Sequence, residues 1–188
     1  MSLSLISCGA LRTSNGYMSN TKDITVKRPE NGRALIVFER ENVRAGEWFT
    51  ATIWEITQRQ KDPKLVGCLH STMKFMTEVD PGEHYFMAIL EGKAELLKAN
   101  IVGNKIYYVL MKMGVESWSS VSYFSPIKKG QDNPIKLSNF SILNSNAFKW
   151  EQENLQSARE HMQKVYDKWD KMSEKEKAKR SLNSEDGR

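Results

Sequence analysis

The stretch WFTATIWEIT, residues 48–57, decides the fold class. Aromatic and β-branched residues fill most of it, and these residue types favour β-strands. Side chains alternate between the two faces of a strand. One face then carries Trp48, Thr50, Thr52, Trp54 and Ile56, and the other carries Phe49, Ala51 and Ile53. Because both faces are partly apolar, one packs in the core, and the other is covered by a C-terminal helix or is open to a ligand or partner.

Similar short apolar runs lie on both sides of this stretch and are separated by turn residues. They cover residues 33–40, 65–70, 75–79, 84–90, 95–102, 105–113, 123–127 and 135–143. No long helical pattern interrupts them. Seven or eight short strands at this spacing predict a mainly β domain over residues 31–143, an antiparallel β-sandwich.

Two turn signals are expected to set the register of these strands. In Asp80-Pro81-Gly82-Glu83, proline presets φ and glycine accepts a positive φ. Gly103-Asn104 is typical of a two-residue hairpin turn. If Gly103 has a positive φ there, a β-branched replacement is strained.

Charge and hydropathy exclude two classes of protein. The net charge of +5 is spread along the chain, with 4 basic and 2 acidic residues in 1–30, 14 and 12 in 31–143, and 10 and 9 in 144–188. A nucleic-acid binder usually concentrates its cations, so we expect no nucleic-acid partner. The longest clean apolar run, residues 34–38, is far shorter than the roughly 20 residues of a membrane-spanning helix.

Residues 144–180 predict a long amphipathic helix. Phe148, Leu155, Met162 and Trp169 recur every seven residues, and Ala158, Val165 and Met172 do the same in between. This alternation is a heptad seam, and Asn146 is suited to the N-cap. Two interpretations follow. The helix folds back, with Phe148, Trp150 and Leu155 on the domain, or it pairs with another helix through its seam.

The seam residues of the second interpretation are Leu155, Met162, Val165, Trp169 and Met172. Its periodicity continues past the length that a small sandwich covers, which favours association with a protein partner or with a second copy of the chain. Residues 181–188 are expected to be a disordered tail, and removal of residues 173–188 is expected to change little.

Two groups of residues carry a resemblance to a known family. The first is the turn of Pro81, Gly82 and His84, and the second is Gly103, Lys105, Tyr107, Tyr108 and Val109. Both resemble the DUF2846-like bacterial lipoprotein domains, over about residues 30–143. The resemblance implies a small envelope β-sandwich behind a lipoprotein signal, with no established catalytic residues.

The N-terminal stretch Leu5-Ile6-Ser7-Cys8 resembles the lipobox of such lipoproteins. Residues 1–8 lack the basic region of a complete signal, so either they are the remnant of a signal that starts upstream of Met1, or the match to the lipobox is coincidental. The polar stretch that follows and the family resemblance favour the first alternative. Cys8 would carry the lipid anchor, and residues 9–30, rich in polar and turn residues, would be a flexible tether. Gly9 in place of aspartate implies an outer-membrane location, facing the periplasm. The other cysteine, Cys68, lies in an apolar run and is expected to be buried.

The sequence offers no recognisable catalytic, cofactor or metal site. His70 and His84 could meet on neighbouring strands, near Glu78 or Glu83, but their spacing matches no metal-ligand signature. We therefore expect a non-enzymatic envelope lipoprotein that acts as an interaction module in a cell-envelope assembly. The alternative is a carbohydrate- or cell-wall-binding module that uses exposed aromatic residues, namely Trp48, Trp54 and Trp118.

Overall fold

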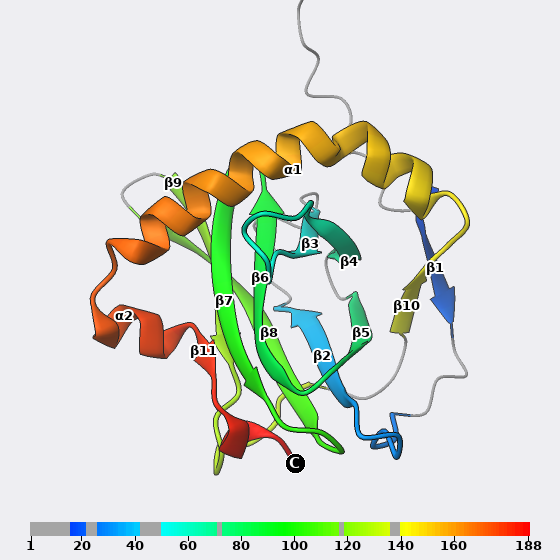
Figure 1. Cartoon of the computed structure of the whole chain (residues 1–188), viewed down its shortest axis with the longest axis vertical. Coiled ribbons are helices and arrows are strands. Elements are labelled where there is room, and N and C mark those ends of the chain that lie inside the picture. Colours follow the sequence, from blue (N-terminus) through cyan, green and yellow to red (C-terminus); the bar gives the residue numbers. More distant parts are fainter. Residues whose placement is uncertain (1–15, 22–25, 42–49, 71–72, 117–118, 136–139) are drawn as a thin grey trace, which may run out of the picture.

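The computed structural model describes residues 16–21, 26–41, 50–70, 73–116, 119–135 and 140–188, which form two mixed β-sheets and a long C-terminal helix (Figure 1). In spatial order, the first sheet contains β1 (Met18–Thr21), β10 (Phe140–Leu143), β5 (Lys74–Val79), β2 (Ala34–Arg40), β8 (Ile106–Glu116) and β9 (Ser119–Pro126). The second contains β11 (Ser181–Leu182), β7 (Lys93–Ile101), β6 (Gly82–Leu90), β3 (Ala51–Glu55) and β4 (Lys64–Leu69). The helices are α1 (Ala147–Asp170), α2 (Glu174–Lys179) and the 3₁₀ turn η3 (Ser184–Asp186).

The predicted fold class, mainly β with a long C-terminal helix, is confirmed. The predicted arrangement of seven or eight antiparallel strands is wrong, because the described residues form 11 strands and three of the pairings are parallel. The parallel pairs are β2 with β8, β10 with β5, and β11 with β7. Each joins segments far apart in the sequence, so no local turn signal could reveal it.

The two sheets pack on each other through aromatic residues. Phe38 of β2 stacks on Phe75 of β5 at a centroid distance of 5.0 Å and meets Phe86 of β6 edge-on at 5.5 Å. Phe124 of β9 lies 6.3 Å from Phe38. All four side chains are at most 2% exposed. Such ring pairs contribute more to the stability of a core than the burial of their apolar area alone.

Strand β3 is buried on both faces, as its sequence pattern requires. Ile53 and Trp54 are 0% and 1% exposed. The ring of Trp54 lies 5.9 Å from that of Trp150 on α1, and Trp150 stacks on Tyr17 at 4.4 Å. The second face of β3 is therefore covered by the C-terminal helix, which is one of the two possibilities that the sequence leaves open.

Helix α1 runs across the strands of the second sheet rather than along them (Figure 1). Its 24 residues extend about 36 Å, whereas five neighbouring strands span only about 20 Å. The N-terminal part of the helix reaches further, to Tyr17 beside β1. This crossing explains how a small domain covers a long helix. No helix in the described part of the chain is long and apolar enough to cross a bilayer.

The inward side of α1 is apolar and its flanks are tied by ion pairs. Ala158, Met162, Val165, Tyr166 and Trp169 are buried. The tying pairs are Arg159 with Asp62 at 2.7 Å and Arg59 with Asp170 at 2.7 Å. Phe148, expected on the domain if the helix folds back, is instead 70% exposed.

The last residues of the chain are ordered, so the expected disordered tail over 181–188 is wrong. The helix stops at Asp170, and α2 begins after the N-cap residue Ser173. Strand β11 then pairs in parallel with β7, and Leu182 is 0% exposed. The final residue, Arg188, exchanges two backbone hydrogen bonds with Ile106, at 2.9 and 3.0 Å.

The expected tether over residues 9–30 is also too long. Strand β1 pairs in antiparallel with β10, and Tyr17 and Met18 are 5% and 4% exposed. The apolar side chains of Tyr17 and Met18, hidden in a polar stretch, supply the burial that local composition did not indicate. Residues 9–15 and 22–25 of the expected tether lie outside the described residues.

The turn expectations need one correction. Gly82 has the expected positive φ of 135°, but β5 and β6 belong to different sheets, so this turn links the sheets. Gly103-Asn104 is no hairpin turn, because β7 and β8 also lie in different sheets. The positive φ there belongs to Asn104, at 58°. The tight hairpin is Glu91-Gly92, with φ values of 47° and 73°, between β6 and β7.

Candidate docking groove beside strand β9

A groove of about 600 Å³ lies between strand β9, the segment that follows it, and helix α2. It is formed where the open edge of the first sheet faces the C-terminal segment that leaves α1. Its lining residues are Tyr123, Phe124, Ser125, Pro126, Lys128, Gln131, Glu176, Lys179 and Arg180. We call this hollow the β9 groove.

The β9 groove is rich in cations. Lys128, Lys179 and Arg180 line it together with a single acidic residue, Glu176. The Glu176 carboxylate accepts hydrogen bonds from the Ser173 amide at 3.0 Å and from the Ser173 hydroxyl at 2.7 Å. These bonds lower the pKa of Glu176, so its negative charge is engaged at the N-terminus of α2.

The three cations differ in how they are held. Lys179 is exposed and makes no hydrogen bond or ion pair with any described residue. Arg180 lies 3.5 Å from Glu95 and donates to the Glu176 carbonyl oxygen at 3.4 Å. Lys179 is therefore the cation most available to an incoming anionic group.

Lys128 fixes the C-terminal segment at the other side of the groove. Its ammonium group donates to the Ser181 carbonyl oxygen and lies 3.3 Å from the Asp186 carboxylate. That carboxylate, in a residue only 3% exposed, also accepts from the backbone amides of Lys129 at 2.9 Å and Asn183 at 2.8 Å. A buried carboxylate needs such partners, so Lys128 and its neighbours already hold one acidic group of the C-terminal segment, in the turn η3.

Strand β9 is an edge strand of the first sheet, and among the described residues no strand pairs with its outer edge. The Ile127 amide donates to the Tyr108 carbonyl oxygen of the neighbouring segment at 2.9 Å. In an antiparallel pair the backbone groups alternate between the two sides of a strand. Ile127 therefore points its backbone groups toward β8, and the β8–β9 register continues without interruption. The alternate residues Ser122 and Phe124 then direct both their N–H and their C=O away from β8. Pro126 has no N–H and directs only its C=O that way.

The structure brings most of the predicted seam residues onto the sheet. Met162, Val165 and Trp169 are 9%, 2% and 6% exposed, and Leu155 and Met172 are half-buried. In this single chain the seam packs against strands β6 and β7, as in the folded-back interpretation. The heptad spacing and the 3.6-residue period of a helix on a sheet are too similar to distinguish over so short a helix.

The predicted ligand-facing aromatic residues do not form a site. Trp54 is 1% exposed, and its indole NH donates to the Thr52 hydroxyl at 2.9 Å. It therefore cannot stack on a sugar in this conformation. Trp48, Trp118 and the candidate lipidation residue Cys8 lie outside the described residues. Cys68 is buried as expected, and burial raises the pKa of its thiol to about 12.

The histidines do not come together. His70 follows β4 and His84 lies on β6, and β3 separates these two strands. His84 instead contacts the Glu55 carboxylate through Nδ1 and the Asp80 carbonyl oxygen through Nε2, both at 2.8 Å. Glu78 pairs with Arg33, and Glu83 with Lys98. Among the described residues, no three His, Cys, Asp or Glu side chains form a group that could hold a metal.

The His84 contact is an ion pair. Both neighbours can only accept, so both ring nitrogens must donate, which requires the protonated imidazole. Burial lowers the pKa of His84, but the hydrogen bonds that His84 donates to Glu55 and Asp80 outweigh this effect, and the pKa is raised. The bond from His84 lowers the pKa of Glu55 against the opposing effect of burial.

The residues of the β9 groove were missed by sequence reasoning. Lys128 and Lys179 are far apart in the chain, and each sits in an ordinary polar segment. Only Pro126 at the end of a predicted strand carried a signal, because proline in a sheet is confined to edges and ends.

The two groups of residues on which the expected family resemblance rests lie at the turn and cross-over ends of β6 and β8. Lys105 and Tyr107 both donate to the Ser184 carbonyl oxygen, at 3.0 and 3.2 Å. They therefore hold the C-terminal segment that borders the groove. No protein-family model matches the chain, and no curated protein sequence matches it significantly.

Proposed function

We propose that the protein is a non-enzymatic bacterial envelope lipoprotein that acts as an interaction module, and that the β9 groove is where its partner docks. The observation that supports this best is the groove itself, which combines an open strand edge with the available cation Lys179. The anchoring part of the proposal rests on the lipobox-like Leu5-Ile6-Ser7-Cys8.

The sequence suggested two binding surfaces, the helix seam and a set of exposed aromatic residues, and neither is the surface proposed here. The helix seam is engaged by the second sheet, which leaves the groove as the surface for a partner. The carbohydrate-binding alternative is weakened because Trp54, one of its three candidate aromatic residues, is buried in the core. No feature of the described residues favours this alternative.

Lipidation is tested with the gene expressed together with its natural upstream sequence. We expect metabolic labelling with a clickable palmitate, and we expect Cys8→Ala to abolish it. Labelling that survives Cys8→Ala, or no labelling of the wild type, contradicts the anchor.

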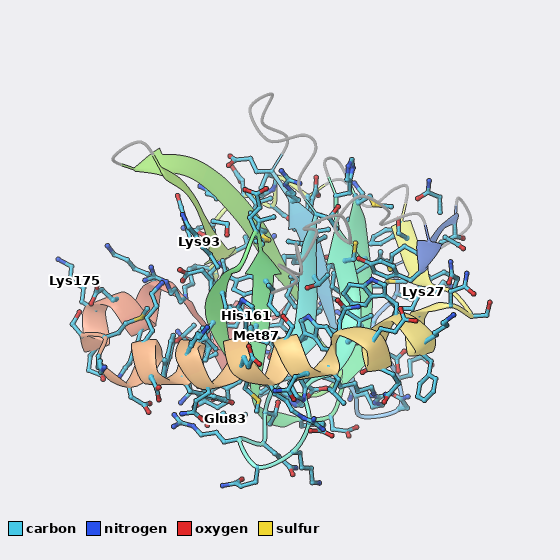
Figure 2. The ribbon with its side chains drawn as sticks, turned by 90° about the horizontal axis from the view of Figure 1, so that it is seen from above. Lys27, Glu83, Met87, Lys93, His161 and Lys175 are labelled. Atoms are coloured by element: carbon cyan, nitrogen blue, oxygen red, sulfur yellow. The ribbon has the colours of Figure 1, made fainter. Side chains whose placement is uncertain are left out.

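Docking is tested with a photo-crosslinking amino acid at Tyr123, which lines the groove and is 39% exposed. The control places the same amino acid at Lys175, which lies on α2 (Figure 2) but is not among the residues that line the groove. We expect a discrete crosslinked product in cells from position 123 and not from 175, and its loss when Lys179→Glu is added. Equal crosslinking from both positions contradicts the assignment of the groove.

A further inference from the structure

We propose that the β9 groove binds an extended acidic peptide segment of the partner, which adds as a strand to the outer edge of β9. This inference rests on the proposed function, because it names the partner chemistry of the same site. It has three supports: the backbone groups of the edge, the charges of the groove, and the way in which the chain binds its own C-terminal segment.

The backbone groups of β9 select an extended ligand. Ser122 and Phe124 each present an N–H and a C=O outward, at the spacing of alternate residues in a strand. An added strand satisfies such groups in pairs, whereas a helix has its own backbone groups already bonded. Pro126 offers no N–H, so pairing ends there and the peptide must leave the edge beside Lys128 and α2.

The charges of the groove select acidic side chains. Lys179 is exposed and Arg180 lies beside it, at the end of α2. The one acidic lining residue, Glu176, is engaged by Ser173. A carboxylate of the added strand therefore meets the available cation Lys179, whereas a lysine at the same place meets its repulsion. Arg180 adds less, because it already contacts Glu95.

The chain itself provides an example of this recognition. Its C-terminal segment adds to the edge of the second sheet as β11, in parallel with β7. Four residues after Leu182, the Asp186 carboxylate is held by Lys128 and by the amides of Lys129 and Asn183. A short strand, followed by a 3₁₀ turn that carries an acidic residue, thus already docks at this end of the fold through backbone pairing and a lysine.

The test uses the full chain and a fluorescein-labelled peptide of alternating valine and glutamate, measured by fluorescence anisotropy. Comparison probes are the same peptide with lysine for glutamate, the acidic peptide N-methylated at alternate residues, and a short oligothymidylate. N-methylation removes donors from one edge of the peptide and leaves its charge unchanged.

The variants separate backbone pairing from charge. Ser122→Pro removes an outward N–H and spares the pairing with β8, and Ser122→Ala is its matched control because it keeps the N–H. Lys179→Glu reverses the available charge, and Lys175→Glu makes the same charge change on α2 outside the groove. Circular dichroism melting of each variant verifies that the fold is retained.

We expect the acidic peptide to bind, and we expect both Ser122→Pro and Lys179→Glu to weaken binding by about tenfold. Ser122→Ala and Lys175→Glu should change it by less than about twofold. N-methylated and lysine peptides should bind at least about tenfold more weakly than the acidic peptide.

Three results overturn the inference: no binding of the acidic peptide, equal binding to wild type and Ser122→Pro, or tighter binding of the oligothymidylate. If position 123 still crosslinks a partner in cells, only the strand-addition chemistry fails and the docking function stands. If the acidic peptide binds as expected but no partner crosslinks, the failure belongs to the proposed function.

Discussion

Gly103 lies directly against the backbone of Gly32: a Cβ atom on Gly103 would stand 2.0 Å from the Gly32 carbonyl oxygen. The contact joins the start of β2 to the cross-over between the sheets, where the Asn104 amide donates to the Arg33 carbonyl oxygen at 2.7 Å. Gly103 has no positive φ, so the expected reason for its glycine is wrong. The lack of space for any side chain is the actual reason.

Gly103→Ala should therefore destabilise the fold by about 2 kcal/mol or more, because neither backbone can give way without breaking this junction. Urea unfolding measures the free energy of unfolding. The comparison variant is Gly130→Ala, where φ is 82° but no atom lies within 4 Å of the added Cβ. It should cost only about 1 kcal/mol, from backbone strain. Equal costs at the two positions would refute the steric explanation.

Removal of residues 181–188 should destabilise the protein by about 3 kcal/mol or more, from the lost burial of Leu182 alone. The deletion also removes the Asp186 partner of Lys128 and the two hydrogen bonds between Arg188 and Ile106. The sequence predicted no effect of such a deletion. Thermal melting measures the change, with Glu185→Ala, an exposed position, as the control that should melt like the wild type.

Trp169→Ala should lower the free energy of unfolding by about 3 kcal/mol, because its side chain is buried between α1 and the second sheet. The matched control is Phe148→Ala, since Phe148 is 70% exposed and should change stability by less than about 0.5 kcal/mol. Light scattering is run on both variants. A changed oligomeric mass with an unchanged melting temperature for Trp169→Ala would restore the helix-pairing interpretation.

The His84–Glu55 pair should make stability depend on pH. The pKa of His84 is raised from 6.5, so its contribution is complete below pH 6.5 and is lost as pH rises through the folded pKa. The pKa of Glu55 is lowered from 4.5, so its contribution is complete above pH 4.5 and is lost as pH falls through the folded pKa. The pair therefore stabilises most between pH 4.5 and 6.5.

The measurement compares wild type with His84→Gln by urea unfolding across this range and at alkaline pH. The difference in free energy of unfolding should be largest between pH 4.5 and 6.5 and should shrink at alkaline pH. A difference that is the same at every pH would show that His84 acts through packing on Phe86 rather than through its charge.

Most strands and the helix could be predicted because each is a local property of the sequence. The run 34–40 and the stretch 51–55 became β2 and β3, since period-two patterns of apolar residues need one or two buried faces wherever they lie. Strand β10 falls within the predicted run 135–143, but β1 and β11 could not be found, because four or fewer residues carry too little pattern and are stabilised by distant partners.

The β9 groove could not be predicted for a related reason. Its cations come from the segment after β9 and from α2, about 50 residues apart, and local charge counts were nearly balanced in both regions. Only the packing of the C-terminal segment on β7 places Lys179 opposite Pro126.

The sequence by itself determined that the chain is mainly β, that a long amphipathic helix follows the strands, and that Trp54 lies on a strand with two apolar faces. These properties follow from periodicity, which requires only near neighbours in the chain. The tertiary structure alone decided that the strands divide into two mixed sheets, that the helix crosses one of them, and that residues 181–188 complete its edge. Parallel pairing and helix placement depend on which distant surfaces bury each other's apolar area, and that choice is a property of the whole chain.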